Sequence, residues 1–476
     1  MKGKLIRSLF SSGLQAVSVQ VLGVIFLGIV AYYLSDEDFG IISWANALSM
    51  FITTIIGFGL EQVVVRRIAA SPTSNWAAAA FLFHVFIGSL VSIAIVSVFA
   101  GVCRDCGEAV SYLPLFYVAQ SVILLIVPLK QFLNAKHIFT PYGVIAIISN
   151  ILKIVVAFVL VGRGYLTVDV VAIIFICASL LEFIFLLIYI LAKTDFSFRF
   201  KIQAYKKLVK EATPQYLSAV FDTTLSRIDW ILLGIIGVSY ASTGAYSFAY
   251  RAYELARLPI VIVAPVILNI FANQLAKDGH QTDEKKRTVN DIFTVQVFFA
   301  VMIPLVFSII WAPVLDSIPN FADKYGSKNE TEFVILSVCI PIQFFINLLW
   351  TLSFSARKYK KITTITIITA SSNVVLNLAL IPFLSGIGAA TAYLITTLIQ
   401  VALYYKLVKE YIIKIHVRPL LVSIILAAVI YFVAARVNLH IAIKASAALI
   451  IYIVAGLGTR TIRKQNLVTL MSLIRK

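Results

Sequence analysis

A row of polar residues recurs through the apolar stretch 214–238, which is long enough to span a membrane. Its members are Gln215, Ser218, Asp222, Ser226 and Asp229. At about 100° per helical residue they fall within about 80° of one another, so they form one stripe on a helix. A charged residue in mid-membrane costs about 2.5–3.5 kcal/mol even on insertion scales, so it needs a partner, a cavity or a function. We expect the stripe to face a cavity, where Asp222 and Asp229 could carry a proton or a sodium ion.

The next apolar stretch, 243–270, combines aromatic and charged residues. Three tyrosines and an arginine share one narrow helical face: Tyr246, Tyr250, Tyr253 and Arg257. Glu254 lies three residues from both Arg251 and Arg257, a spacing that allows ion pairing along a helix. Two interpretations stay open. The three charges could brace the helix by neutralising one another, or the net positive cluster could bind an anion while Glu254 carries a proton or sodium ion.

Two further bases lie inside apolar stretches, namely Lys153 and Arg227. Together with Arg251 and Arg257 they predict a cavity suited to an anion, because a guanidinium fork matches the oxygens of a phosphate. Glu182 also lies in mid-stretch. It could carry a proton, or it could pair with Lys153 across two helices.

The sequence lacks the motifs of common enzyme sites. It has no Walker-type phosphate loop, no HExxH metal motif, no GxSxG nucleophile motif and no loop long enough for a catalytic domain. Cys103 and Cys106 form a C-x-x-C without a nearby His or second pair that would suggest zinc, and a loop disulfide between them stays open. We therefore expect no enzymatic activity, no cofactor and no metal site.

The composition predicts the elements that hold these residues. Of 476 residues, 61% are hydrophobic and 13% charged, whereas soluble domains have about 45–50% apolar and about 25% charged residues. We count about fourteen spans of about 20 residues, at 14–34, 41–60, 76–100, 111–133, 142–161, 168–191, 214–238, 243–270, 292–315, 333–354, 362–383, 389–408, 420–435 and 441–457. Such runs are too long and too continuously apolar for barrel strands. The prediction is an all-α polytopic membrane protein.

The net charge of +18 is distributed between the spans. Lys and Arg gather in alternate loops, which the positive-inside rule assigns to the cytoplasm, so both termini are expected there. No basic domain with interleaved aromatic residues indicates a nucleic-acid partner. The basic stretch 193–213 could be a helix on the anionic leaflet or a solvated linker.

The two halves of the chain resemble each other. Residues 39–45 and 243–249 share Gly, Ser, an aromatic residue and Ala in register. Four weaker matches keep the same order: 134–138 with 355–359, 149–152 with 372–375, 162–164 with 386–388, and 178–182 with 396–400. We infer parallel repeats, as in transporters built from two halves around a central site. The predicted organisation is an N-terminal six-helix lobe (1–192), a basic cytoplasmic linker (193–213), a C-terminal six-helix lobe (214–413), and two appended helices with a basic tail (414–476). The two pseudo-symmetric lobes would enclose a central cavity.

Several segments resemble a known family. They are Ser-Leu-Phe-Ser-Ser-Gly at 8–13, Tyr-Leu-Ser-Asp-Glu-Asp-Phe-Gly at 33–40, Gly-Phe-Gly-Leu-Glu-Gln at 57–62, Arg66 with Arg67, and the stretches 229–249 and 386–390. With them the chain resembles the Wzx-type O-antigen and polysaccharide flippases, a polysaccharide transporter family of the multidrug/oligosaccharidyl-lipid/polysaccharide exporter superfamily. The resemblance covers nearly the whole chain, but its motifs are diffuse and specify the family better than the substrate.

The resemblance implies a bacterial inner-membrane flippase. It would move an undecaprenyl-pyrophosphate-linked oligosaccharide to the outer leaflet by alternating access, driven by H⁺ or Na⁺. The basic cavity would receive the pyrophosphate, and the three tyrosines would offer ring faces and hydroxyls to the sugars. Membrane lipids are expected partners, and a polymerase and a chain-length regulator could be others. A drug exporter, a peptidoglycan-precursor flippase and, further off, a membrane polymerase remain alternatives.

Overall fold

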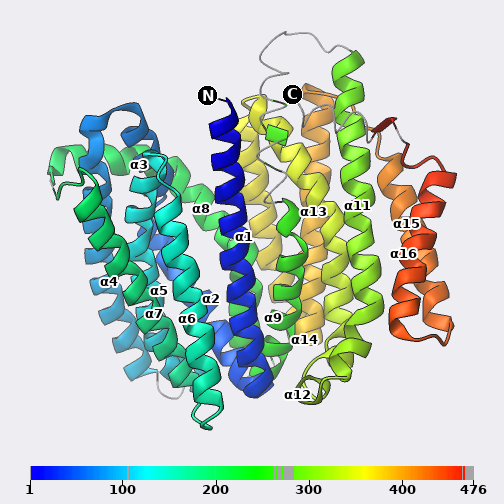
Figure 1. Cartoon of the computed structure of the whole chain (residues 1–476), viewed down its shortest axis with the longest axis horizontal. Helices are drawn as coiled ribbons and strands as arrows, with labels where there is room; N and C mark the ends of the chain where they lie inside the picture. Colours follow the sequence, from blue (N-terminus) through cyan, green and yellow to red (C-terminus); the bar gives the residue numbers. More distant parts are fainter. Residues whose placement is uncertain are drawn as a thin grey trace. The chain divides into compact units, whose positions relative to one another are not determined.

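The computed structural model describes residues 2–103, 107–198, 200–237, 239–260, 264, 267–268, 271, 283–463 and 465–466. Over these residues the chain is helical and contains no strand, which confirms the predicted all-α class (Figure 1). The helices are α1 (Lys2–Tyr33), α2 (Asp36–Gly57), α3 (Leu60–Ala70), α4 (Trp76–Val102), α5 (Glu108–Ala135), α6 (Thr140–Val161), α7 (Val168–Lys193), α8 (Ile202–Ile236), α9 (Tyr240–Ala256), α11 (Asp283–Asp316), α12 (Pro319–Ala322), α13 (Glu330–Ser355), α14 (Tyr359–Tyr411), α15 (Arg418–Arg436) and α16 (Ile441–Gly458). Cys106 lies outside the described residues, so the Cys103–Cys106 disulfide stays a prediction.

Ten helices in the described part of the chain are long and apolar enough to cross a membrane. The predicted number of about fourteen is not confirmed. Helix α14 alone runs for 53 residues and holds two predicted spans, which meet at Ser385 (φ 50°, ψ −124°). Helix α8 is not among the ten, and its apolar end, residues 219–236, carries three charged residues: Asp222, Arg227 and Asp229. The predicted span 243–270 lies only partly within the described residues.

Contacts divide the chain into two compact units, Met1–Ser247 and Phe248–Lys476. Helix α8 packs against α2 and α3 and so belongs to the first unit. The boundary between these two units falls inside α9, and the predicted division into lobes at 193–213 stays a prediction. Residues 202–213 of that segment are the first turns of α8 and not a separate surface helix.

The first unit is a layered helical bundle. Helices α4 and α5, α5 and α7, and α6 and α7 lie side by side (Figure 1). Its core draws on α3, α4, α5, α7 and α8. Ala77, Ala78 and Ala80 of α4 are completely buried in it. Small side chains let helix backbones approach closely, which is how helices associate where lipid removes the hydrophobic driving force.

The two copies of the repeated motif meet within the first unit, where α2 crosses α9. A side chain on Gly40 would collide with the backbone of Tyr240 and come within 3.0 Å of Gly244 N. One on Gly244 would collide with the Asp36 carbonyl and come within 3.2 Å of Gly40 N. Beside them, Ser247 Oγ donates a hydrogen bond of 2.9 Å to Ser43 Oγ. Gly40 and Gly244, and likewise Ser43 and Ser247, occupy matching places in the repeat. Equivalent residues contact each other in this way around a two-fold axis, which supports the inferred repeat.

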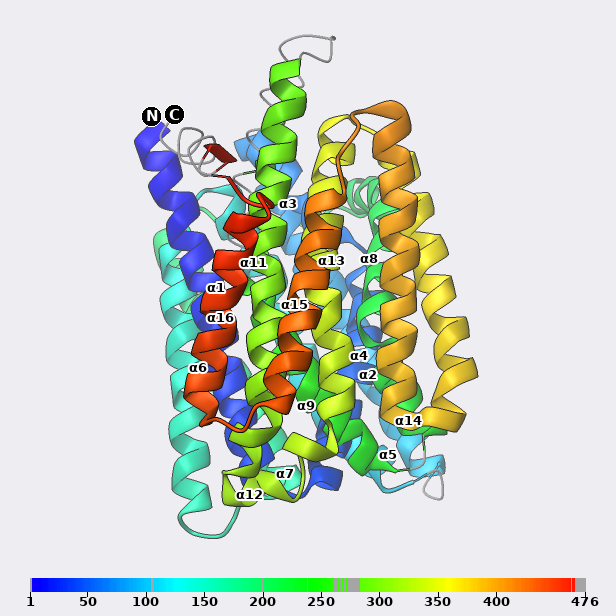
Figure 2. The same ribbon diagram turned by 90° about the vertical axis from the view of Figure 1, so that its right-hand side faces the viewer.

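The second unit packs α11 and α13–α16 around one core. Helices α15 and α16, the predicted appended pair, lie along α11 (Figure 2). Tyr452 of α16 stacks on Phe298 of α11, with ring centroids 4.8 Å apart, and its hydroxyl donates to the Phe298 carbonyl at 3.0 Å. Because Gly456 has no side chain, it leaves room for the Phe298 ring. The pair is therefore built into the core of this unit.

Candidate functional site

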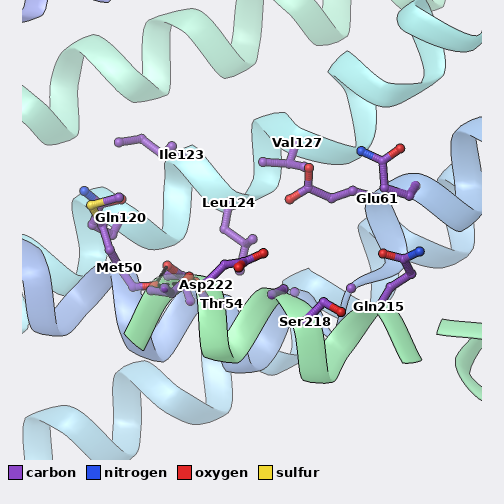
Figure 3. A pocket seen from close by; sticks show the side chains of 16 residues that line it. Met50, Thr54, Glu61, Gln120, Ile123, Leu124, Val127, Gln215, Ser218 and Asp222 are labelled. Carbon is purple, nitrogen blue, oxygen red and sulfur yellow. Dashed lines mark hydrogen bonds between the residues drawn. The ribbon is translucent and has the colours of Figure 1, made fainter. Parts of the chain in front are cut away.

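A polar cavity of about 450 Å³ lies inside the first unit, between α2, α3, α5 and α8 (Figure 3). Amide, carboxyl and hydroxyl side chains supply its polar lining: Thr53, Thr54, Glu61, Gln62, Gln120, Gln215, Ser218, Asp222 and Thr223. Among the described residues that line it, none is Lys or Arg and two are carboxylates. The cavity is therefore rich in hydrogen-bonding groups and negative in charge.

The predicted stripe on α8 reaches this cavity through three of its five members. Gln215, Ser218 and Asp222 line it. Asp229, farther along the helix, is instead completely buried. Its carboxylate accepts hydrogen bonds from the Tyr246 hydroxyl and, at 2.9 Å, from the backbone N–H of Trp230. The first three residues of the stripe thus line the cavity, whereas Ser226 and Asp229 do not.

A break between α2 and α3 brings a second carboxylate to the cavity. Phe58 (φ 49°) and Gly59 (φ 64°) are both left-handed, which ends α2 and starts α3 in a new direction. A Cβ on Gly59 would collide with the backbone of α8 at Tyr216, so only glycine allows this approach. The Phe58 ring stacks on Tyr216, with centroids 4.3 Å apart. The predicted span 41–60 therefore ends early, and the turn directs Glu61 into the cavity.

Side chains behind the cavity wall hold its polar groups in place. Gln131 Nε2 donates to Glu61 Oε2 at 3.0 Å, and Asn134 Nδ2 donates to Gln131 Oε1 at 2.9 Å. Gln120 Nε2 donates to Asn46 Oδ1 at 2.8 Å. Sequence reasoning did not single out Glu61 or Gln120 as site residues. For Gln120 the signal was an amide inside an apolar helix, where an unpaired amide is costly.

The Ile56 carbonyl, next to the break at the end of α2, also has a hydrogen-bond partner. His84 Nε2 lies 2.8 Å from the Ile56 carbonyl, and His84 Nδ1 lies 2.6 Å from the Tyr205 hydroxyl. A carbonyl only accepts, so Nε2 carries the proton toward Ile56. This histidine ties α4 to both α2 and α8.

The first unit holds two of the predicted anion-binding bases. Lys153 of α6 lies 5.4 Å from the Phe175 ring centroid and has Glu182 of α7 as its charged neighbour. Both interpretations of Glu182, as a proton carrier and as a partner of Lys153, stay predictions. The Arg227 guanidinium lies 4.8 Å from the Trp230 ring centroid and has Asp229 as its charged neighbour.

Arg251 and Arg257 belong to the second unit, where α9 breaks inside the span. Helix α9 ends at Ala256, and the Arg257 N–H reaches the carbonyls of both Tyr253 and Glu254 at 3.2 Å. Pro259 follows two residues later. A proline has no N–H to continue the ladder and crowds the preceding turn, so it favours a break here. Interrupted membrane helices are a recurrent feature of transporter binding sites.

The Arg257 guanidinium faces phenol groups. It lies 5.1 Å from the Tyr253 ring centroid, with Tyr250, Tyr393 and Glu254 as its other electrostatic neighbours. The hydroxyls of Tyr253 and Tyr393 are 3.0 Å apart. Tyr250 and Tyr253 are buried to within 1%, as is Tyr246 in the first unit, so their ring faces are not open in this structure. What the cluster offers is a fixed cation beside hydroxyl groups.

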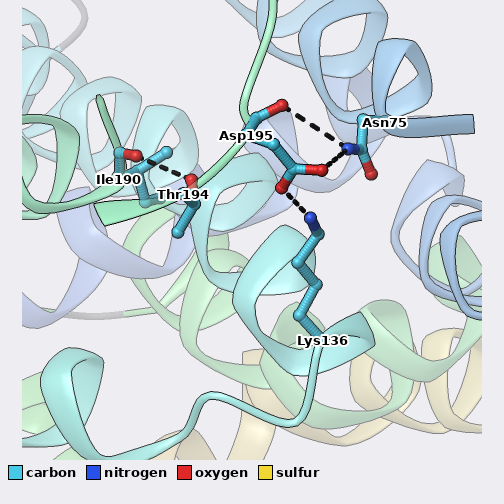
Figure 4. A network of polar contacts seen from close by, with 5 residues as sticks. All are labelled: Asn75, Lys136, Ile190, Thr194 and Asp195. Atoms are coloured by element: carbon cyan, nitrogen blue, oxygen red, sulfur yellow. Dashed lines mark hydrogen bonds and ion pairs between the residues drawn. The ribbon is translucent and has the colours of Figure 1, made fainter. Parts of the chain in front are cut away.

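A further polar network lies outside the cavity (Figure 4). Asp195, in the segment after α7, accepts hydrogen bonds from Lys136 and, at 2.8 Å, from Asn75 Nδ2. The hydrogen bond from Lys136 lowers the pKa of Asp195. Nearby, Arg67 of α3 binds Glu211 of α8 through two nitrogens, at 2.5 and 3.1 Å. These contacts fasten the loops and helix ends that frame the first unit.

Comparison with known proteins identifies relatives of this arrangement. A family model described as polysaccharide biosynthesis protein matches residues 5–273. The fold is similar to that of the lipid II flippase MurJ in an inward closed conformation, with a TM-score of 0.76 and 17% identity over 95% of this chain and 99% of that one. No curated protein matches by sequence.

Transporters of a wider superfamily share the fold. The Vibrio cholerae MATE transporter VcmN in its bent form gives a TM-score of 0.57 at 13% identity, over 86% of this chain and 98% of that one. A MOP superfamily transporter from Pyrococcus furiosus, described as having a binding pocket of reverse polarity, gives 0.58 at 13% identity, over 85% and 95%. At these identities the likeness shows the fold alone. The chain is a multi-pass membrane protein with this transporter fold.

Proposed function

Because the chain belongs to the polysaccharide biosynthesis protein family, we propose that it is a flippase for an undecaprenyl-pyrophosphate-linked oligosaccharide. It would carry this lipid from the cytoplasmic to the outer leaflet of a bacterial inner membrane by alternating access, with both termini in the cytoplasm. No cofactor within the chain is needed for this reaction, because no covalent bond is made or broken. A polymerase and a chain-length regulator would act on the product.

The observation that carries the proposal is the arginine–tyrosine cluster at the break in α9. Arg257 is held over Tyr253 and beside further phenols, inside the predicted span 243–270. Keeping a guanidinium there is costly unless it serves a ligand or a partner. A pyrophosphate suits both components, since it can accept from the guanidinium and from tyrosine hydroxyls. Arg251, Arg227 and Lys153 would add to the positive potential that attracts it.

We propose that transport is coupled to an ion gradient through one of the predicted carboxylates. Of the four candidates, Asp229 is bonded to Tyr246, and Glu182 and Glu254 each have a basic neighbour. Asp222 is exposed and faces the polar cavity. We therefore propose Asp222 as the principal carrier of the coupling ion, H⁺ or Na⁺. An Asp222→Asn variant that kept full transport under every ion gradient would exclude it.

The test of function is mass spectrometry of lipids from the native host after depletion of the protein. We expect a complete pyrophosphate-linked repeat unit to accumulate on the cytoplasmic side. Cells carrying Arg257→Gln should accumulate this lipid as well. Cells carrying Arg257→Lys should accumulate less of it, because lysine keeps the charge but not the guanidinium fork. The control is Arg163→Gln, at an exposed site in the loop after α6, and cells carrying it should resemble cells with the unaltered protein. If depletion left this intermediate unchanged, the proposal would be wrong.

A second candidate is a peptidoglycan-precursor flippase, which the likeness to MurJ favours. The same extract separates the two. Accumulated lipid II would support that role, whereas a longer or different glycan on the pyrophosphate would support the role proposed above.

A further inference from the structure

The polar cavity of the first unit has a chemistry that the pyrophosphate does not explain. Amides and hydroxyls from four helices converge on it, and the only charges among its described lining residues are the carboxylates of Glu61 and Asp222 (Figure 3). An anion placed there would be repelled by both carboxylates and attracted by no base. The occupant must therefore be neutral or cationic, and rich in groups that donate to oxygen acceptors.

The cavity has room for much more than the coupling ion proposed for Asp222. At about 450 Å³ it falls within the range of small-molecule sites, about 300–1,000 Å³. An ion site instead gathers oxygen ligands to within about 2.3–2.6 Å of one point. Here the two carboxylates come from different helices, α3 and α8, and one oxygen of Glu61 is already occupied by Gln131.

The wall is also fixed before any ligand arrives. Glu61 is held by Gln131, Gln120 by Asn46, and the hydroxyls of Thr54 and Thr223 lie 3.2 Å apart. Polar groups that are already oriented lose little entropy when they bind, so they favour a ligand with matching hydroxyls. A site built to bind hydroxyls strongly rejects an analogue that lacks them.

We propose that this cavity binds hydroxyl groups of the glycan of the transported lipid, so that the protein distinguishes a glycosylated carrier from the bare one. The inference rests on the proposed function, and it assigns the sugar-binding role to α3, α5 and α8 in place of the buried tyrosines. Gln215, Ser218 and Gln120 supply hydrogen bonds to the sugar, and the two carboxylates accept from hydroxyls while excluding the pyrophosphate.

The test compares two lipids on the full chain in lipid nanodiscs. One is the glycosylated lipid that accumulates when the protein is depleted, and the other is undecaprenyl pyrophosphate without sugar. The measured quantity is the ratio of their dissociation constants. The variant is Gln215→Leu combined with Ser218→Ala, both on the accessible face of α8. The matched control is Gln203→Leu, the same change at an exposed site of the same helix away from the cavity.

We expect the unaltered protein and the control to prefer the glycosylated lipid by the same ratio. The combined variant should lower that ratio by about tenfold, because two hydrogen bonds to the sugar are lost. An unchanged ratio in the combined variant, or no preference in the unaltered protein, would overturn the inference. In either case, binding of undecaprenyl pyrophosphate would still support the pyrophosphate site. Failure of the unaltered protein to bind either lipid would instead overturn the proposed function, and the inference with it.

Discussion

Alanine at Gly40 should destabilise the protein, although alanine normally favours a helix. A Cβ at Gly40 would lie 2.7 Å from the carbonyl carbon of Tyr240, still closer to its oxygen, and 3.0 Å from Gly244 N. These are backbone atoms, so the helices α2 and α9 would have to separate. Overpacking of this kind costs about 1–3 kcal/mol, and the upper end applies because no side chain can move aside. Subtracting about 1 kcal/mol of helix propensity gained from glycine to alanine leaves a net loss of about 2 kcal/mol.

The matched control is Gly28→Ala in α1, where nothing lies within 4 Å of the new methyl group. Only the propensity gain applies there, so this variant should be more stable by up to about 1 kcal/mol. The assay is the thermal unfolding midpoint of each variant in the same detergent, in which the two alanines should shift the midpoint in opposite directions. If Gly40→Ala raised the midpoint as much as Gly28→Ala, the close crossing of α2 and α9 would be refuted.

Two further predictions concern the polar contacts of the first unit. The pKa of Asp195 is lowered by Lys136, so this carboxylate stabilises the protein above the ordinary carboxyl pKa, and the stabilisation disappears as the pH falls through the lowered value. Asp195→Asn should therefore reduce the thermal unfolding midpoint at neutral pH. The difference in midpoint between the variant and the unaltered protein should disappear in acid and in high salt. Arg67→Lys removes the two-point contact with Glu211 but keeps the charge, and because the pair is partly exposed the loss should stay below about 1 kcal/mol. A double-mutant cycle of Arg67→Lys with Glu211→Gln should give a coupling energy of the same size.

Helical periodicity predicted the cavity lining correctly only along the part of α8 that borders the cavity. Gln215, Ser218 and Asp222 share a face of α8 and do line the cavity. Asp229 continues the same face, yet there α8 meets Tyr246 of α9, and the carboxylate is buried against that hydroxyl. A helical wheel describes directions around one helix and contains no information on where a neighbour begins.

The missed carboxylate and the misplaced helix boundary have similarly local causes. Glu61 was placed at the end of a span because hydropathy continues through Gly57-Phe58-Gly59, whereas the backbone turns left-handed there. The basic segment 193–213 was separated from the following span because its charges end the apolar run. Charge does not end a helix, and the backbone hydrogen bonds of α8 continue from Ile202 to Ile236. Average hydropathy therefore located the spans better than it located the turns.

The crossing of α2 and α9 places a residue of one repeat against its own counterpart in the other, as with Gly40 and Gly244 or Ser43 and Ser247. Such a contact resembles the interface of a homodimer enclosed within a single polypeptide. In a homodimer, one gene sets both sides of the interface, so a larger side chain is always introduced twice. Here the two sides are encoded separately. A bulkier residue on one helix of the crossing could be accommodated by a smaller residue on the other helix. The two halves of one chain can therefore become different in sequence while they keep the same point of contact.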